Sequence, residues 1–490
     1  MNTFMNNLNA VSNFTLTENG ALTHKSTMNM VLDMFAMGAA YRNRTEEDCI
    51  LLFKNAYEEN PELALKCLFY IGDCRGGQGE RRFFCTCYNW LAKNDSEVAL
   101  RNMELIPVYR RWKDVIYSLV DTPIESDMFK FIDKQLKLDM QCETPSLLGK
   151  WLPSENTSSK ETRALARKTR KALNLDSKSY RQMLSALRQK INVLERLMSA
   201  GEWDKIKFDK IPSKAGLIYK NAFARRDIIS QKYKEFVEDK NTTVNAKDLY
   251  PYEIVNEALK WHITDTDKLV IEKYWNNLPD YFNGDDSSML VMVDTSGSMC
   301  GPHAAAPINV AISLGMYAAE RSKGPFKDHY ISFSRNPKLV KIEGADFADK
   351  VERIYVTNIC ENTDVAKALE LLKHIALLPT TKKEDIPKTL VIVSDLEFDY
   401  MTTGRIGSSA NAETLLEGIA KEWEKAGLEL PHIVFWNVDA RQNNIPMLGR
   451  SRISYVSGMS PTIFETIITG KSGVELMLEI LNSARYEAIH

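Results

Sequence analysis

The amino-acid sequence predicts an α-helical array over residues 1–280, followed by an α/β domain over residues 285–490. Two observations support this division. Before residue 280 the apolar residues recur at helical spacing, whereas from about residue 288 short apolar runs alternate with helical segments. The second pattern is typical of a doubly wound, mostly parallel, Rossmann-like sheet. The expected fold class is therefore a multidomain α plus α/β protein.

In the first part, many short helices are expected to follow one another in an irregular, HEAT-like array. No exact sequence period supports a strict repeat. We expect no strands in this part. The expected helices span residues 28–40, 46–57, 61–71, 79–92, 97–106, 112–120, 129–138, 179–200, 220–235, 252–260 and 266–277.

In the second part, Asp294 and Asp395 each follow an apolar, strand-like run. Ligands of open α/β sheets bind at the carboxyl ends of the strands, so both aspartates are expected at a ligand site. The expected strands span residues 289–293, 330–333, 339–342, 389–394, 432–438 and 453–456. The expected helices span residues 307–322, 363–376, 412–426, 462–468 and 474–484.

Charge is distributed unevenly along the chain. The net charge is −2, yet residues 157–234 hold 20 Lys and Arg against 7 Asp and Glu, a balance of +13. Such a stretch favours an anionic partner. No apolar run approaches the roughly 18 residues of a membrane-spanning helix, residues 1–22 are polar, and the eight cysteines are scattered. We expect a cytoplasmic protein with reduced thiols and no membrane partner.

The most specific motif is Asp294-Thr-Ser-Gly-Ser298, at the end of an apolar run. One carboxylate and two hydroxyls at alternate positions form an oxygen-rich site, which suits a hard divalent cation such as Mg²⁺. The motif resembles the metal-ion-dependent adhesion site of a von Willebrand factor A domain. The resemblance implies that Ser296, Ser298 and Thr363 contact the metal directly, and that Asp294 and Asp395 act mainly through water. It also implies an open coordination position for an acidic group of a partner protein.

Two positions depart from that family's pattern. Glu361 stands where the family often has glycine, and Leu396 follows Asp395 where glycine is also common. Glu397 and Asp399 come directly afterwards and would place internal carboxylates near the open position. A domain that keeps the fold and holds no metal is the alternative.

A glycine-rich segment, Asp-Cys-Arg-Gly-Gly-Gln-Gly-Glu-Arg-Arg, begins at Asp73. Its glycines allow backbone N–H groups to approach a ligand, and the start of the next helix adds positive potential. Arg75, Arg81 and Arg82 are therefore candidates for phosphate contact. The alternative is a turn between helices whose arginines pair with Asp73 or Glu80.

Basic residues interleaved with aromatic ones follow this segment. Arginines among aromatic rings suit phosphate contact combined with base stacking, and like charges as dense as those at 167–171 repel one another unless an anion neutralises them. The alternative is a solvated basic helix with core aromatics. The candidate residues are Arg110, Arg111, Arg167, Lys168, Arg170, Lys171, Arg225 and Arg226, among Tyr109, Trp112, Trp151 and Tyr180.

The glycine-rich segment, Arg-Arg-Trp-Lys-Asp-Val at 110–115, Pro-Ser-Lys-Ala at 212–215 and the C-terminal domain together resemble the domain-of-unknown-function family numbered 2828. That family is similar to the TROVE proteins, which include the Ro autoantigen. The resemblance implies a helical ring that binds RNA, closed by a von Willebrand A domain. Single-stranded ends would enter the basic lumen, and structured non-coding RNA would lie outside.

The expected function is therefore that of an RNA-binding, TROVE-like ribonucleoprotein component with a metal-dependent A domain. The alternative is a metal-dependent adaptor that grips an acidic protein without nucleic acid. No catalytic residue is assigned, because no histidine is placed as a base for Ser296; His303, the nearest in sequence, follows Gly-Pro in a loop. Hydroxyls also outnumber carboxylates at the motif, unlike the acidic clusters of two-metal hydrolases.

Overall fold

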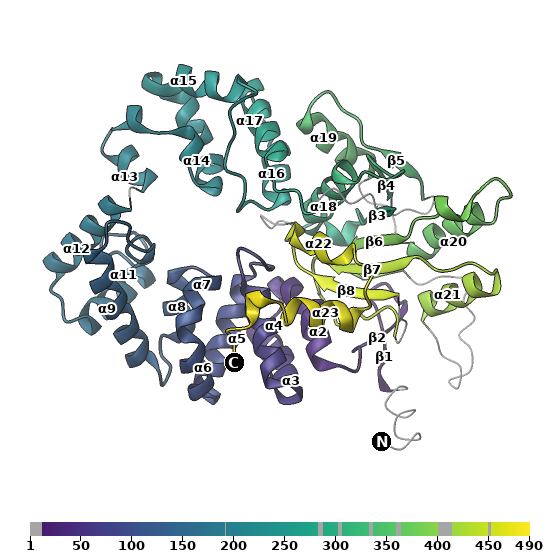
Figure 1. Ribbon diagram of the computed structural model, residues 1–490, viewed down its shortest axis with the longest axis horizontal. Helices are drawn as coiled ribbons and strands as arrows, with labels where there is room; N and C mark the ends of the chain where they lie inside the picture. The colour runs from purple at the N-terminus through teal and green to yellow at the C-terminus, as the bar shows by residue number, and fades with distance from the viewer. Residues whose placement is uncertain are drawn as a thin grey trace.

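The computed structural model describes residues 12–191, 193–282, 288–301, 306–332, 337–358, 364–399, 414–448 and 452–490. The predicted ligand Thr363 lies outside these residues, as do Glu361 and His303. An arc of helices forms the N-terminal part, and a mixed, mostly parallel sheet with its helices forms the C-terminal part (Figure 1).

Short helices build the arc, as the sequence predicts, because each buries an apolar face against its neighbours. Two predicted helices are divided: in the first, one helix ends at Lys190 and the next begins at Leu194, and in the second Arg226 adopts an extended backbone conformation. The helices of the arc are α2 (Met30–Met37), α3 (Glu46–Glu59), α4 (Pro61–Gly72), α5 (Arg81–Asn94), α6 (Ser96–Asn102), α7 (Ile106–Tyr109), α8 (Trp112–Leu119), α9 (Glu125–Gln141), α10 (Leu148–Trp151), α11 (Lys160–Ala172), α12 (Ser177–Lys190), α13 (Leu194–Ser199), α14 (Ser213–Arg225), α15 (Asp227–Glu238), α16 (Pro251–Ala258) and α17 (Asp265–Asn276).

The expectation of no strands before residue 280 is wrong. β1 (Phe14–Leu16) and β2 (Leu22–His24) form an antiparallel hairpin. Strands this short leave too little alternation to be recognised in the sequence. The hairpin also packs on the C-terminal part, since the backbone N–H of His24 donates to the carbonyl of Ile445 over 3.1 Å.

The C-terminal sheet has the order β5-β4-β3-β6-β7-β8. All neighbouring strands are parallel except the edge pair β4–β5, which confirms the predicted, mostly parallel sheet. Gly315 lets helix α18 approach this sheet closely, because a Cβ there would collide with Val293. The strands are β3 (Met289–Val293), β4 (His329–Ser332), β5 (Leu339–Lys341), β6 (Thr389–Ser394), β7 (His432–Asn437) and β8 (Ile453–Ser457). The helices are α18 (Pro307–Arg321), α19 (Phe347–Asn358), α20 (Val365–Ala376), α21 (Leu415–Lys425), α22 (Phe464–Ile467) and α23 (Gly473–Leu481).

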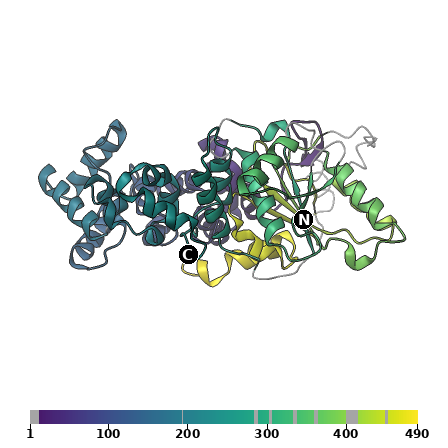
Figure 2. The same cartoon turned by 90° about the horizontal axis from the view of Figure 1, so that it is seen from above.

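Both ends of the arc contact the sheet domain (Figures 1 and 2). At one end α16 packs on α18, and α17 packs on α19. At the other end α2 packs on β7 and β8, and α4 packs on α23. Each end of the helical arc therefore packs on the sheet domain.

Candidate nucleic-acid site and candidate metal site

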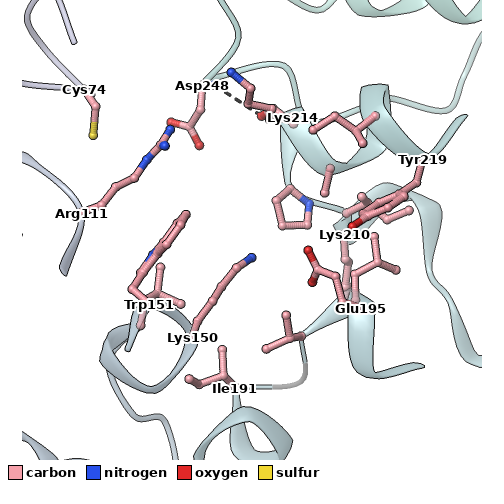
Figure 3. A pocket seen from close by; sticks show the side chains of 18 of the residues that line it. Cys74, Arg111, Lys150, Trp151, Ile191, Glu195, Lys210, Lys214, Tyr219 and Asp248 are labelled. Atoms are coloured by element: carbon pink, nitrogen blue, oxygen red, sulfur yellow. Dashed lines mark hydrogen bonds between the residues drawn. The ribbon is translucent and has the colours of Figure 1, made fainter. Parts of the chain in front are cut away.

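A cavity of about 1030 Å³ lies within the arc, between α7, α8 and α10 on one side and residues 205–214 with α14 on the other (Figure 3). Nine basic and three acidic residues line it, so the lining holds six more positive than negative charges. Such an excess in one hollow attracts anions. The basic residues are Arg75, Arg81, Arg110, Arg111, Lys150, Lys205, Lys207, Lys210 and Lys214, and the acidic ones are Glu195, Asp248 and Glu253.

Trp151 is an aromatic side chain at the basic wall of this cavity, which Trp112 also lines. The Arg111 guanidinium lies 5.4 Å from the centre of a Trp151 ring, and the ammonium groups of Lys113 and Lys150 lie 5.1 and 5.8 Å away. Figure 3 shows Trp151 beside Arg111 and Lys150, with the Lys150 amine pointing into the open space. The pKa of Lys113 is lowered, first by burial and then by the charges of Arg81 and Arg111. This wall therefore combines a half-buried ring with positive potential.

The opposite wall follows from an alternation in the sequence. Ile206 and Phe208 are buried, whereas Lys207 and Lys210 are exposed. Because the apolar side chains are anchored in the core, the lysines that interrupt them remain at the surface of the cavity. Lys150, Lys207 and Lys210 are absent from the predicted site residues. The alternation of basic and apolar residues at 205–211 is the signal that could have revealed the last two.

Four of the cavity's basic side chains have charged groups without an ion pair or hydrogen bond to any residue that the structure describes. They are Arg111, Lys150, Lys207 and Lys210. Lys214, by contrast, pairs with Glu253, and Lys205 lies 3.4 Å from Glu202. Unpaired cations gathered in one hollow repel one another until an anion neutralises them.

The glycine-rich turn contacts three other segments of the chain, through Arg42, Tyr250 and Arg485. Asp73 pairs with Arg485 and Glu80 pairs with Arg42, so neither carboxylate pairs with the guanidinium groups of the arginines that flank the turn. The Glu80 carboxylate also accepts the backbone N–H of Arg82 in the first turn of α5 at 3.0 Å, and thereby caps that helix. Gly79 has φ 66°, and a Cβ there would collide with the Tyr250 hydroxyl.

The flanking arginines bind within the protein, and two of them also reach the cavity. Arg75 donates to the carbonyl of Val108, Arg81 to the carboxylate of Asp114, and Arg82 to the carbonyls of Arg42 and Arg44. Arg75 and Arg81 line the cavity, whereas Arg82 does not. The next two arginines in the sequence differ in exposure. Arg110 is 3% exposed and pairs with Asp114, whereas its neighbour Arg111 is exposed.

The basic helix α11 does not contribute to the cavity lining. Lys168 Nζ lies 2.6 Å from each of two carboxylates, and Arg170 Nε lies 2.9 Å from a third. Arg167 and Lys171 are exposed. Half of this charge cluster is therefore neutralised within the protein and needs no outside anion.

Arg225 and Arg226 lie at a second, shallower hollow of about 650 Å³ at the end of α14. The Arg226 guanidinium lies 4.9 Å from the centre of the Trp203 ring. Tyr219 lines both this hollow and the central cavity.

The predicted metal motif lies where β3 and β6 end side by side. Asp294 is fully buried, accepts the backbone N–H of Ser296 at 2.9 Å and accepts the hydroxyl of Ser394 at 2.5 Å. The hydroxyls of Ser296 and Ser298 lie 2.9 Å apart. Burial, and then the negative charge of Asp395, raise the pKa of Asp294 above its usual range. Two convergent hydroxyls beside buried carboxylates are compatible with Mg²⁺.

Asp395 has a partner that the motif does not predict. Arg441 Nη2 donates to Asp395 at 2.8 Å, and Arg441 Nη1 lies 2.5 Å from Glu18 in the β1–β2 hairpin. The carboxylate of Glu397 accepts the backbone N–H of Glu18 at 2.7 Å. The hairpin is therefore fixed to the loop that follows β6, and the extra carboxylate of that loop is held by the hairpin.

Comparison with known proteins gives two family matches. Residues 17–120 and 146–284 match the family described as Domain of unknown function (DUF2828), and residues 288–485 match Domain of unknown function (DUF7788). The predicted resemblance to the first family is confirmed. No helix in the described ranges has the length and apolar character needed to cross a membrane.

Two individual proteins are similar over almost the whole chain. Uncharacterized protein L728 of Acanthamoeba polyphaga mimivirus is 27% identical over 517 residues, covering 96% of this chain and 88% of the relative. The crystal structure of the Ro protein (RSR) of Deinococcus radiodurans is 12% identical with a TM-score of 0.40, covering 93% of this chain and 99% of that one.

Proposed function

The chain belongs to the family described as Domain of unknown function (DUF2828), and we propose that it binds single-stranded RNA in the central cavity of its helical arc. The observation that carries the proposal is the set of four unpaired cations, Arg111, Lys150, Lys207 and Lys210, gathered around one hollow. Helix α11 has a lesser part in this proposal, because two of its four basic side chains are already paired.

The chemistry of the cavity fits the two parts of a nucleotide. Phosphate groups suit the unpaired cations, and Trp151 supplies a ring on which an unstacked base can lie. The volume of about 1030 Å³ is at the upper end of pockets that enclose a drug-sized ligand. It suits one or a few nucleotides of a single strand, whose bases are free to leave the stack, and excludes a duplex.

The test is the affinity of a fluorescent oligouridylate of about twelve nucleotides, measured by anisotropy at about 0.1 M salt. The double variant Lys150→Glu/Lys210→Glu reverses one unpaired charge on each wall and should weaken binding at least about tenfold. Arg167→Glu/Lys171→Glu makes the same charge change on α11 and should weaken binding less than about threefold.

Equal losses in the two double variants would contradict a site in the cavity and would indicate attraction by overall charge. The same oligomer in DNA form, and inorganic polyphosphate, distinguish a nucleic-acid site from a general anion site. Polyphosphate that competes as well as RNA, per phosphate, would contradict the role of Trp151.

We also propose that the sheet domain is a von Willebrand factor A domain and that its motif holds Mg²⁺. Asp294, Ser296, Ser298 and Asp395 are its residues in the described structure, and the resemblance adds Thr363. The ion would supply a positive charge able to bind a carboxylate. Isothermal titration with MgCl₂ tests this: wild type should bind one ion, and Ser296→Ala/Ser298→Ala should bind none. Binding that survives this change would contradict the assignment.

The convergent hydroxyls also favour a second candidate function, a metal-dependent grip on an acidic protein. One set of binding measurements distinguishes the two functions. If the protein is only an adaptor, wild type should capture an acidic peptide in Mg²⁺ but not in EDTA, and should show no salt-dependent affinity for RNA. If RNA binding is the function, Ser296→Ala/Ser298→Ala should leave RNA affinity within about twofold.

A further inference from the structure

We infer that the strand bound in the central cavity continues along α14 to a second nucleotide subsite, the hollow formed by Trp203, Tyr219, Arg225 and Arg226. This inference rests on the proposed RNA binding and goes beyond it, because it assigns a path and a second site. The subsite would accept one phosphate together with the base attached to it.

The first support is a continuous stripe on α14. Ala215, Ile218 and Tyr219 line the central cavity, and Tyr219, Ala222 and Arg225 line the hollow. These positions are three or four residues apart, so they lie on one face of the helix. Tyr219 belongs to both sets and is the common wall. The stripe from Ala215 to Arg225 is about 15 Å long at 1.5 Å per residue.

The second support is the charge at the end of the stripe. Arg225 and Arg226 are exposed, and their guanidinium groups have no ion pair with any residue in the described part of the chain. Trp203 holds the Arg226 guanidinium at 4.9 Å from its ring centre. A stacked guanidinium loses little freedom when it binds a phosphate, because its plane is already fixed.

The third support is the character of the remaining wall. Trp203 is 8% exposed, so its ring serves as the floor beneath Arg226. Tyr219 is half-buried, and burial is the first cause of its raised pKa, so the ring stays neutral. A neutral ring beside two arginines offers a base a stacking surface and its phosphate a cation. Met198 and Ala222 complete an apolar margin.

The length of the stripe gives a quantitative expectation. A stacked strand advances about 3.4 Å per nucleotide, so about four or five nucleotides span the 15 Å. An oligomer of about four nucleotides that fills the cavity leaves none to span the stripe, whereas one of about twelve fills the cavity and still reaches the second site. Linking two sites through one strand raises affinity, because the second contact becomes intramolecular.

The experiment compares oligouridylates of about four and about twelve nucleotides on wild type and three double variants. Arg225→Glu/Arg226→Glu should bind the short oligomer within about twofold of wild type and the long one at least about tenfold more weakly. Lys150→Glu/Lys210→Glu should weaken both lengths. Arg167→Glu/Lys171→Glu, the matched change on α11, should leave unchanged the ratio by which the long oligomer binds more tightly than the short one.

If the long oligomer still binds more tightly than the short one to Arg225→Glu/Arg226→Glu, by the wild-type ratio, the path along α14 is overturned. That result would not contradict the site in the cavity. Wild type that binds neither oligomer would overturn the proposed function and this inference together. Ultraviolet crosslinking gives an independent readout: only the long oligomer should label the peptide that contains Trp203, which lines the hollow and not the cavity, and both oligomers should label the peptide that contains Trp151. Labelling of α11 in place of Trp203 would contradict the path.

Discussion

The guanidinium of Arg485 binds the buried carboxylate of Asp73 through two nitrogen atoms, with 2.8 Å between Nη2 and Oδ1, although the two residues are 412 positions apart. The Tyr486 hydroxyl donates to the same carboxylate over 3.1 Å. The glycine-rich turn of the helical arc is thereby tied to the segment that follows α23. This contact secures one of the two junctions between the arc and the sheet domain.

Arg485→Ala should destabilise this junction. Asp73 is fully buried, so the substitution leaves a buried charge with fewer partners, and we expect a loss of roughly 2 kcal/mol. The loss stays below that for a fully buried pair because the Arg485 side chain is 39% exposed. Urea denaturation measures it. Arg101→Ala, which removes an exposed helix pair with Glu97, is the control and should lose less than about 0.5 kcal/mol. Equal losses would contradict the role of the junction.

His432, at the start of β7, should make stability depend on pH. Burial, and then the charge of Arg452, lower the pKa of His432 from 6.5 to about 4. Because the folded-state pKa lies below the unfolded one, the neutral form stabilises the fold fully above pH 6.5. That contribution, about 3 kcal/mol, is lost as pH falls through the window from 6.5 to about 4.

The free energy of unfolding between these pH values measures the effect. His432→Gln should remove about 1.4 kcal/mol per pH unit from the slope within the window. His262→Gln, at an exposed position, is the control for the exchange of a histidine for glutamine. A wild-type slope retained by His432→Gln would contradict the assignment to this residue.

Arg441 should weaken metal binding at the end of β6, because its positive charge lies 2.8 Å from Asp395. Arg441→Ala should therefore tighten Mg²⁺ binding by about tenfold, as measured by isothermal titration. Glu18→Gln keeps the Arg441–Asp395 pair and should change the affinity less. Unchanged or weaker binding in Arg441→Ala would show that Arg441 does not compete with the ion.

The sheet domain could be predicted well because its signals are local. Met289–Val293 and Thr389–Ser394 are continuous apolar runs that end in a polar residue, and the two strands pair in parallel register. Asp294 and Ser394 consequently lie together at the carboxyl ends of these two neighbouring strands. The pairing of Asp395 with Arg441 could not be predicted, because it depends on how a loop after β7 folds back over the end of β6.

The site in the arc could be predicted only in part, because charge density does not show which side chains are already paired. Lys168 and Arg170 belong to the dense basic cluster at 167–171 that predicts anion contact, yet carboxylates from other segments neutralise both. Lys150 has no basic neighbours in the sequence. Its side chain points into the cavity, because α10 lies opposite residues 205–214. Long-range packing decides such cases, and a single sequence does not record it.

The central claim is that phosphates of a single strand bind the unpaired cations of the cavity. The dependence of affinity on salt tests it most directly, because each phosphate contact adds about 0.7 to the slope of log Kd against log salt for a single strand. Lys150→Gln/Lys210→Gln should lower the slope by about 1.4 for a strand of about twelve nucleotides. A slope equal to that of wild type, or a wild-type affinity that does not change with salt, would contradict the claim.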